Sequence, residues 1–334
     1  MSRNITSRRN FMLAVAAISG LAAGGVPLAG AASEPLPRLR VEQARSDLLE
    51  FGYHAAGPEE GRPVILLHDL GYDIHSYTEV ARLLAAEGYR AIVPYLRGHG
   101  TTRFNHASTL RSGQQAAVGS DVIALMDVLH IPEAVIAGFG WGARAACVAA
   151  VLKPTRCVGV VAVNGYAAGN LTSPLSRQAQ AALAHQYYYF QTERGRARLE
   201  ANRGDAARIL WADNSPGWPF DDALLKRAVA AFDNPDYVDV VIHSWRHRLG
   251  RVAGDARYEA VERKLAERPL IAVPSIVLAG DASGVVPDRD TADRFSGPYS
   301  HHPVPGAGHH LPQEAPEAFA DAVIELVRNG KWRT

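Results

Sequence analysis

The sequence predicts an α/β protein in which helices flank a mostly parallel central sheet. Short apolar runs rich in β-branched residues recur along the chain, and helix-like segments lie between them. Continuous apolar strands that alternate with helices are typical of a parallel sheet covered on both faces. A chain of 334 residues that is 47% hydrophobic is also long enough to bury a large core. The predicted strands are Val64–His68, Ala91–Tyr95, Ala134–Gly138, Val158–Val163, Ser275–Gly280 and His301–Val304.

The composition excludes several classes of protein. The 35 basic and 34 acidic side chains give a formal net charge of +1, so there is no basic surplus for binding nucleic acid. The apolar fraction is too high for a disordered chain. Two cysteines cannot form a disulfide scaffold. Cys147 and Cys157 lie in apolar runs, which indicates two buried side chains.

The first 31 residues have the pattern of an export signal. Arg8 and Arg9 precede an apolar run of small residues, and no acidic residue occurs before Glu34. Ala29–Ala31 has the A-x-A pattern of a cleavage site, and the paired arginines resemble the twin-arginine signal. Glycines and a proline interrupt the apolar run, which disfavours a membrane-spanning helix. We therefore expect a periplasmic or secreted protein, exported by the twin-arginine machinery and without a stable membrane anchor after cleavage. An uncleaved N-terminal anchor is the alternative.

The strand pattern stops between Asn164 and Pro274. This stretch has the pattern of helices broken by turns such as Ser215–Pro219. An insertion of roughly 100 residues between two strands predicts a helical cap. We place it over the edge where the parallel strands end, because such sheets bind ligands there. The predicted division is a signal peptide at 1–31, the N-terminal part of the core at 32–165, the cap at 166–268 and the C-terminal part of the core at 269–334.

Residues that follow the predicted strands point to nucleophilic catalysis. Gly138–Gly142 reads Gly-Phe-Gly-Trp-Gly between a strand and a helix, which is the pattern of a nucleophile elbow. The helix N-terminus favours negative charge that develops there. His68 ends an earlier strand, where such folds place an oxyanion-binding loop, and His309 follows the last strand as a candidate general base. For His309 the alternative is a histidine in a surface loop.

These motifs, in this order, resemble the α/β-hydrolase superfamily and, within it, the branch of epoxide hydrolases and haloalkane dehalogenases. The resemblance spans nearly the whole chain after the signal. It implies the α/β-hydrolase fold, a helical cap and a catalytic nucleophile, acid and base. The stretches that carry it include Pro94–Phe104, Thr192–Gly195, Asn234–Tyr237, Val240–Ser244, Pro305–His309 and Leu311–Pro316.

Three positions depart from the pattern that the resemblance implies. Relatives carry Gly-x-Asp-Trp-Gly at the elbow, whereas Gly140 stands at the position of the aspartate and cannot form an ester intermediate. Ser283 stands at the position of the acid, and Asp281 lies two residues before it. The oxyanion loop, His-Gly-x-Pro in relatives, reads His-Asp-Leu-Gly at 68–71. Only the base His309 stays in place, so the triad is degenerate.

Backbone groups and cap tyrosines complete the predicted site. The N–H groups of Trp141 and Asp69 are expected to stabilise an oxyanion, because such donation does not depend on the side chain. Tyr187, Tyr188 and Tyr189 lie in the cap, where the resemblance implies tyrosines that hydrogen-bond the oxygen of an epoxide. An apolar packing stripe with polar tips is the alternative for these tyrosines.

Two further patterns are weaker. Gly138–Ala143 matches a dinucleotide-binding fingerprint, but the next strand ends at Asn164 without an acidic residue to hold a ribose. His243 and His247 have the four-residue spacing of a metal site, but no third ligand is indicated. Two histidines on one helix face is the favoured interpretation. We therefore predict neither a cofactor nor a metal.

The sequence leaves two main functions open. In the first, the space left by the missing carboxylate at Gly140 holds a water that His309 activates as a general base. Asp281 or Ser283 orients the imidazole, and the substrate is a small, mostly apolar epoxide, ester or lactone. In the second, the protein is an inactive pseudo-hydrolase that binds a small apolar ligand under its cap. A third possibility is a lyase or a cofactor-free oxygenase that needs only the histidine. The sequence does not distinguish it from the first function.

Overall fold

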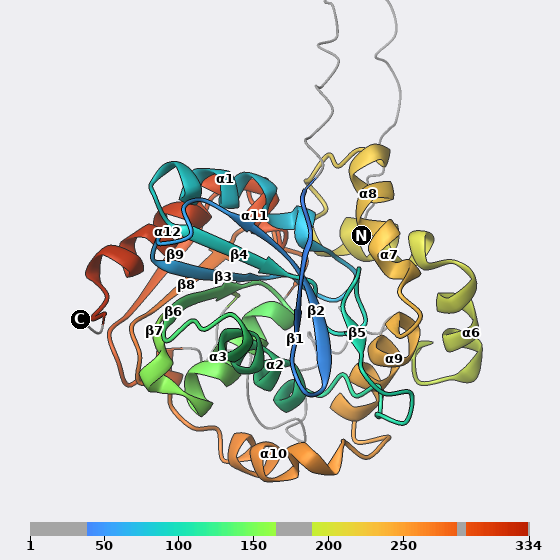
Figure 1. The fold of residues 1–334 in the computed structure, drawn as a ribbon. Coiled ribbons are helices and arrows are strands. Elements are labelled where there is room, and N and C mark those ends of the chain that lie inside the picture. The colour runs from blue at the N-terminus through green and yellow to red at the C-terminus, as the bar shows by residue number, and fades with distance from the viewer. Residues whose placement is uncertain (1–38, 165–188, 286–291, 333–334) are drawn as a thin grey trace, which may run out of the picture. The chain divides into compact units, whose positions relative to one another are not determined.

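Nine strands form one sheet in the part of the chain that the structure describes. The computed structural model describes residues 39–164, 189–285 and 292–332, so the predicted signal peptide at 1–31 lies outside them. The strand order is β1-β2-β4-β3-β6-β7-β8-β9, and β5 pairs with β2 (Figure 1). The strands are β1 Glu42–Arg45, β2 Leu49–Ala56, β3 Pro63–Leu67, β4 Arg90–Pro94, β5 Arg103–Phe104, β6 Ala134–Gly138, β7 Cys157–Val163, β8 Ser275–Gly280 and β9 Tyr299–Val304.

The central strands are parallel, as the sequence predicted. The pairs β3–β4, β3–β6, β6–β7, β7–β8 and β8–β9 all run in the same direction. Each of these strands overlaps a predicted one, and β6 and β7 are buried along their whole length. Burial of both faces explains why these strands read as continuous apolar runs. The antiparallel strands β1, β2 and β5 carry no such run and were not predicted.

Helices cover both faces of the sheet. α1 and α12 pack together on one face, and α2 and α3 pack together on the other (Figure 1). α3 lies against β6 and β7, which fixes its N-terminus at the end of β6. The described helices are α1 Thr78–Ala86, α2 Gln115–Val128, α3 Trp141–Leu152, α6 Glu193–Ala201, α7 Arg203–Asn214, α8 Asp222–Val229, α9 Tyr237–Arg248, α10 Glu259–Ala266, α11 Leu311–Glu314 and α12 Pro316–Asn329, with short 3-10 turns η1 Ile74–Tyr77, η2 Pro154–Arg156, η3 Ala230–Asp233, η4 Ala256–Tyr258 and η5 Ala292–Arg294.

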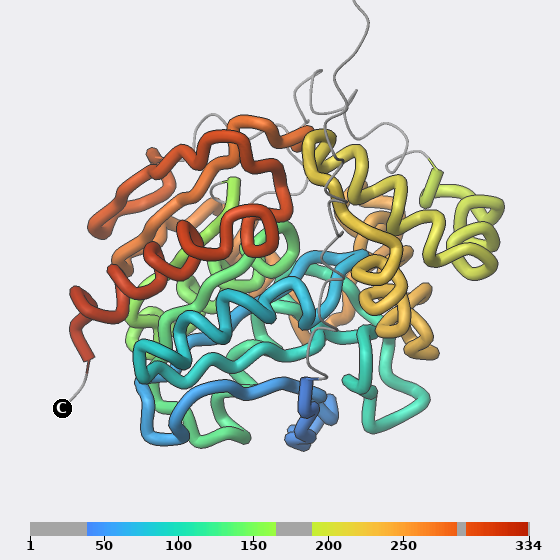
Figure 2. The backbone as a smooth tube through the Cα atoms, turned by 90° about the horizontal axis from the view of Figure 1, so that it is seen from above, coloured from blue at the N-terminus to red at the C-terminus, as the bar shows by residue number. Residues whose placement is uncertain are grey.

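Helices α6 to α9 lie between β7 and β8 in the chain and gather on one side of the sheet (yellow and orange in Figures 1 and 2). We call these four helices the cap. Side chains such as Thr192 and Asp221 accept hydrogen bonds from backbone N–H groups at the starts of α6 and α8. The Trp211 side chain donates to the Gly71 carbonyl at 2.9 Å, so α7 lies over the loop that follows β3.

The two cysteines lie in the core. Cys147 and Cys157 are free and buried, and burial raises the pKa of the Cys157 thiol to about 12. Both therefore act as small apolar side chains in the core. Among the described residues, every helix is too short or too polar to cross a bilayer.

Candidate active site

The turn after β6 has the backbone geometry of a nucleophile elbow. Gly140 lies between β6 and α3 with φ 53° and ψ −120°, a conformation that favours glycine. The Gly142 N–H donates to Phe139 O at 2.9 Å, and the Arg144 N–H donates to Gly140 O at 3.1 Å, so the turn leads directly into α3. A Cβ on Gly138 or on Gly142 would overlap backbone atoms of a facing segment. The glycines are therefore required by close packing of the turn.

The carboxylate of Asp69 fills the space beside this elbow. Asp69 follows β3, which is the neighbour of β6 in the sheet. Its Oδ1 accepts hydrogen bonds from the backbone N–H groups of Leu70 and Trp141, each at 2.7 Å. A Cβ built on Gly140 would overlap Cγ and both carboxylate oxygens of Asp69.

One prediction made from the sequence is therefore wrong. The space beside Gly140 is not left for a water, because the Asp69 carboxylate occupies it. The Trp141 N–H, which was predicted to donate to an oxyanion, donates here to Asp69 Oδ1, together with the Leu70 N–H. From the sequence, only the backbone N–H of Asp69 was given a role. In the structure, its side-chain carboxylate lies in the site.

His309 lies in a buried position against this carboxylate. Its Nε2 is 3.2 Å from Asp69 Oδ2, and the side chains are 5% and 12% exposed. The ring also lies edge-on to Phe139, with centroids 5.6 Å apart. The two side chains come from loops that are 240 residues apart in the chain.

Asn164 holds the other nitrogen of the His309 ring. Asn164 directly follows β7 and has a positive φ of 65°, and its Nδ2 lies 3.1 Å from His309 Nδ1. Its Oδ1 is buried and has no partner among the described residues. A 180° rotation of the amide would bring Oδ1 onto an Nδ1–H group, which satisfies both atoms. Nε2 is then the nitrogen that faces Asp69.

Asp281 and Ser283 do not orient His309, although the sequence suggested this. The Asp281 Oδ1 accepts the Gly306 N–H at 2.7 Å, and Asp281 is exposed. The Ser283 hydroxyl is bonded to the backbone of Val285. Both side chains shape the loops after β8 and β9. Asn164 was missed because its amide is not an acid, although its place after a central strand was a usable signal.

His68 fixes the loop after β3 through both nitrogens of its ring. Its ring is fully buried. Nδ1 lies 2.8 Å from Asp69 O, and Nε2 accepts the Leu96 N–H at 3.1 Å. Burial, reinforced by the nearby His99 ring, holds the pKa of His68 well below its usual range. The ring is therefore neutral and connects the ends of β3 and β4.

The predicted tyrosines are only partly described. Tyr187 and Tyr188 lie outside the described residues. Tyr189 is half-buried, and its carbonyl accepts hydrogen bonds from the N–H and the hydroxyl of Thr192 at the start of α6. Its ring lies 6.3 Å from the ring of Phe190.

The loop that carries His309 is bonded to the end of α7. The Ser215 hydroxyl oxygen accepts the backbone N–H groups of His309 at 2.8 Å and His310 at 3.1 Å. The same hydroxyl donates to Glu314 Oε1 at 2.7 Å, and Glu314 Oε2 accepts the Gly308 N–H at 2.7 Å. These hydrogen bonds tie the loop to the cap and to α11. None of these supporting residues was predicted, because their role depends on contacts between distant segments.

His243 and His247 lie on the same helix, as predicted, and the ring of His243 contacts backbone groups of two other segments. The His243 ring accepts the Gly113 N–H at Nδ1 and lies 3.2 Å from Ala253 O at Nε2. His243 and His247 stack with centroids 5.6 Å apart. Within residues 39–164, 189–285 and 292–332, no group of three or more histidine, cysteine or acidic side chains is placed to hold a metal ion.

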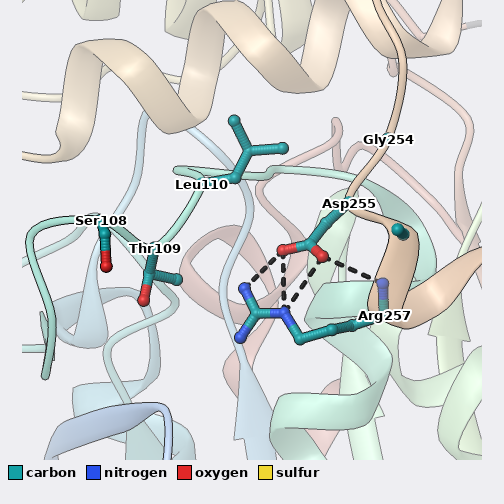
Figure 3. A pocket seen from close by; sticks show the side chains of 7 residues that line it. Ser108, Thr109, Leu110, Gly254, Asp255 and Arg257 are labelled. Atoms are coloured by element: carbon teal, nitrogen blue, oxygen red, sulfur yellow. Dashed lines mark hydrogen bonds and ion pairs between the residues drawn. The ribbon is translucent and has the colours of Figure 1, made fainter.

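A hollow of 420 Å³ lies on another part of the described surface. Asp255 and Arg257 face each other there and form an ion pair at 2.5 Å (Figure 3). Their charges neutralise each other, and none of the residues that line this hollow belongs to the site around His309.

The fold and this site define a member of the alpha/beta hydrolase family. The sequence profile of that family matches residues 64–322, which is more than half of the chain, so the chain belongs to it. Within this family, the chain is similar to epoxide hydrolases.

A solved structure from Klebsiella pneumoniae, described as a candidate epoxide hydrolase, is 44% identical with a TM-score of 0.84. The match covers 86% of this chain and 97% of that one. Epoxide hydrolase A of Mycobacterium tuberculosis is 27% identical over 299 residues, which is 80% of this chain and 91% of the relative. The magnesium-chelatase 30 kDa subunit of Rhodobacter capsulatus is also 27% identical, over 80% of this chain and 88% of its own length.

Proposed function

We propose that this protein hydrolyses a small, mostly apolar epoxide with a water that His309 activates. The observation that carries the proposal is the buried contact between His309 Nε2 and the Asp69 carboxylate, 3.2 Å apart. A base held in a fixed orientation by a second group is the recurring arrangement for proton transfer in hydrolases. Asn164 supplies that second group at 3.1 Å. Epoxide hydrolase A and the candidate epoxide hydrolase among the relatives support the substrate class.

An epoxide is a better substrate for this site than an ester or a lactone, because the backbone N–H groups of Trp141 and Leu70 already donate to Asp69. A carbonyl substrate needs N–H donors for the oxyanion that forms on attack. The N–H groups of Trp141 and Leu70 are already bonded to Asp69 Oδ1. An ester or lactone would have to displace this carboxylate before it reacted. An epoxide is opened by attack at carbon and does not need the same donors.

The test is turnover by the purified protein with styrene oxide, a chloroalkane and a p-nitrophenyl ester. We expect diol release from the epoxide, and a loss of about 10²- to 10⁴-fold in His309→Gln. The spectrum of the variant in circular dichroism controls for folding. Tight binding of the epoxide without diol release by the parent would instead support the alternative, an inactive pseudo-hydrolase whose elbow lacks a nucleophile at Gly140.

We also propose export through the twin-arginine machinery, on the strength of the paired Arg8 and Arg9 and the apolar run that follows them. Residues 1–31 fused to a reporter that folds before export would test this. Export of the fusion, and its loss when both arginines are changed to lysine, is the expected result. A reporter that stays in the cytoplasm in both forms would contradict the proposal.

A further inference from the structure

The carboxylate that the elbow lacks is supplied by a different loop. We propose that Asp69 is the nucleophile of the reaction and forms a covalent ester with the epoxide, at the position where the elbow residue would otherwise place its side chain. This inference rests on the proposed hydrolysis of an epoxide and adds the residue that attacks it.

The Asp69 carboxylate lies in the space that a side chain at position 140 would enter. A side chain that began at Gly140 would collide at its Cβ with the Asp69 Cγ and both carboxylate oxygens. A side chain on the elbow and the side chain of Asp69 therefore cannot both occupy this space. Gly140 has no side chain, so the Asp69 carboxylate can lie there. The positive φ of Gly140, 53°, keeps the turn sharp, and its neighbour Trp141 directs its N–H to Asp69.

The two oxygens of the Asp69 carboxylate have different surroundings. Oδ1 accepts two backbone N–H groups, from Leu70 and Trp141, both at 2.7 Å. This is the arrangement that stabilises an oxyanion, and the atom that it surrounds belongs to Asp69 itself. Oδ2 accepts no backbone N–H from the described residues and faces His309 at 3.2 Å. Oδ2 is therefore the oxygen available for attack, and Oδ1 becomes the carbonyl oxygen of the ester.

Two features indicate that Asp69 does more than orient His309. Orienting an imidazole uses one carboxylate oxygen, and it can be done by another group. His309 already has Asn164 on its Nδ1. The N–H pair on Oδ1 has a use when Cγ passes through a tetrahedral state, because negative charge then develops on that oxygen.

Hydrogen bonds hold the loop after β3 in place, as a nucleophile at Asp69 requires. The Asp69 carbonyl lies against the His68 ring at 2.8 Å, and the Tyr77 hydroxyl donates to Leu67 O at 2.9 Å. The Trp211 indole N–H donates to Gly71 O at 2.9 Å. These contacts fix the backbone on both sides of Asp69. A nucleophile held in place by its surroundings loses little entropy on reaching the reactive geometry.

The reaction then proceeds in two balanced steps. In the first, Asp69 Oδ2 forms a bond to an epoxide carbon, the ring C–O bond breaks, and the epoxide oxygen takes a proton from a hydroxyl or a water under the cap. In the second, His309 takes a proton from a water, and the oxygen of that water attacks Cγ. Collapse of the tetrahedral state expels the diol oxygen, which takes the proton from His309. The new Asp69 carboxylic acid loses its proton and restores the acid used in the first step.

A single-turnover experiment in H₂¹⁸O separates this route from direct attack by water. With enzyme in excess over styrene oxide, attack by Asp69 puts a protein oxygen into the diol, so the diol of the first turnover contains no ¹⁸O. The label appears in the peptide that contains Asp69. Direct attack of a water activated by His309 would instead place ¹⁸O in the diol at once and leave the peptide unlabelled, which would overturn the proposal for Asp69 and leave the proposed function intact.

A trapping experiment with variants provides a second readout. In His309→Gln the second step is blocked, so we expect the protein to gain the mass of one styrene oxide, located at Asp69 by peptide mapping. The double variant Asp69→Asn/His309→Gln should show no adduct. Diol release by the parent without any adduct in His309→Gln, or with an adduct at another residue, would overturn the proposal. Absence of turnover and of adduct in every form would overturn the proposed function and this inference together.

Discussion

The turn after β6 and the loop after β3 meet at one edge of the sheet, and they contribute different parts of the same site. The turn keeps the elbow backbone, with φ 53° at Gly140 and an N–H donor at Trp141, but it has no reactive side chain. The loop contributes the carboxylate of Asp69 and a second N–H donor from Leu70. Backbone geometry and side-chain chemistry are therefore separable, and a residue on a neighbouring strand end can supply what the elbow lacks.

The sharpest test of this division is the substitution Asp69→Asn. The amide keeps the shape of the side chain and an oxygen for the two N–H donors, but it is a poor nucleophile. We expect diol formation to fall by about 10⁴-fold or more, as when the nucleophile of a catalytic triad is removed. Steady-state kinetics with styrene oxide would measure the loss. A variant that keeps more than a tenth of the parent rate would show that the side chain of Asp69 is not needed.

An exchange of residues between the two loops is the next test. Gly140→Asp alone should lose about 10²-fold or more, since its Cβ overlaps the Asp69 carboxylate and displaces it. Asp69→Gly alone should lose the nucleophile. The double variant Asp69→Gly/Gly140→Asp puts a carboxylate on the elbow and removes the side chain that blocks it, so we expect it to exceed both single variants in rate.

The double variant carries a cost that can be measured separately. A side chain at the φ of 53° at position 140 is strained, by about 1–3 kcal/mol. Urea denaturation should show this loss of stability in both variants that contain the Gly140→Asp substitution. A double variant that folds but is no faster than either single variant would contradict the idea that the two loops serve one position.

Much of this arrangement follows from the sequence, and the remainder depends on how distant loops meet. The parallel strands, the elbow and the place of His309 after the last strand were predictable, because buried strands and tight turns leave local patterns. Asp69 was noticed only as a departure in the His-Asp-Leu-Gly stretch. No local pattern shows that its carboxylate reaches the elbow, since that depends on the alignment of β3 beside β6.

The structure also replaces the predicted orienting residue. The sequence pattern pointed to Asp281 and Ser283, after β8, whereas the side chain beside His309 Nδ1 is Asn164, after β7. Both strands end at the same edge of the sheet, so each position was compatible with the fold. Only the conformation of the loops decides which side chain reaches the imidazole.

The pH dependence of stability tests the role of His68, which holds the loop after β3. Burial keeps the pKa of His68 well below its usual range, so the folded state does not bind the proton that the unfolded state binds below about pH 6.5. Stability therefore falls as the pH falls, by about 1.4 kcal/mol for one such histidine between pH 7.5 and 5.5. His99, with a pKa lowered to about 4 by burial, adds to the same slope.

Urea denaturation at both pH values measures this slope, and His68→Asn is the matched variant. Asparagine keeps one donor and one acceptor but does not titrate in this range. We expect a smaller decrease in stability at pH 5.5 than in the parent. An equal decrease in both proteins would mean that His68 does not contribute to the slope.

The contact from Asn164 should have a moderate effect on the rate. Asn164→Ala removes the buried hydrogen bond to His309 Nδ1, and a loss of about tenfold corresponds to a bond of about 1.4 kcal/mol. Asn164→Asp should restore the contact and move the acidic limb of the pH–rate profile to higher pH, because a negative charge stabilises the protonated imidazole. A profile that does not move would argue against direct contact.

Asp281→Asn is the counterpart of these variants and should have the smallest effect. Its carboxylate accepts the Gly306 N–H at 2.7 Å, and an amide oxygen can accept the same bond. We expect diol formation within about twofold of the parent, because a substitution at an exposed side chain away from the reacting groups changes little. A loss as large as that of Asn164→Ala would return the orienting role to the loop after β8. The two variants together decide which strand end supports His309, since each strand carries a polar residue at the same edge of the sheet and only one of them contacts the ring.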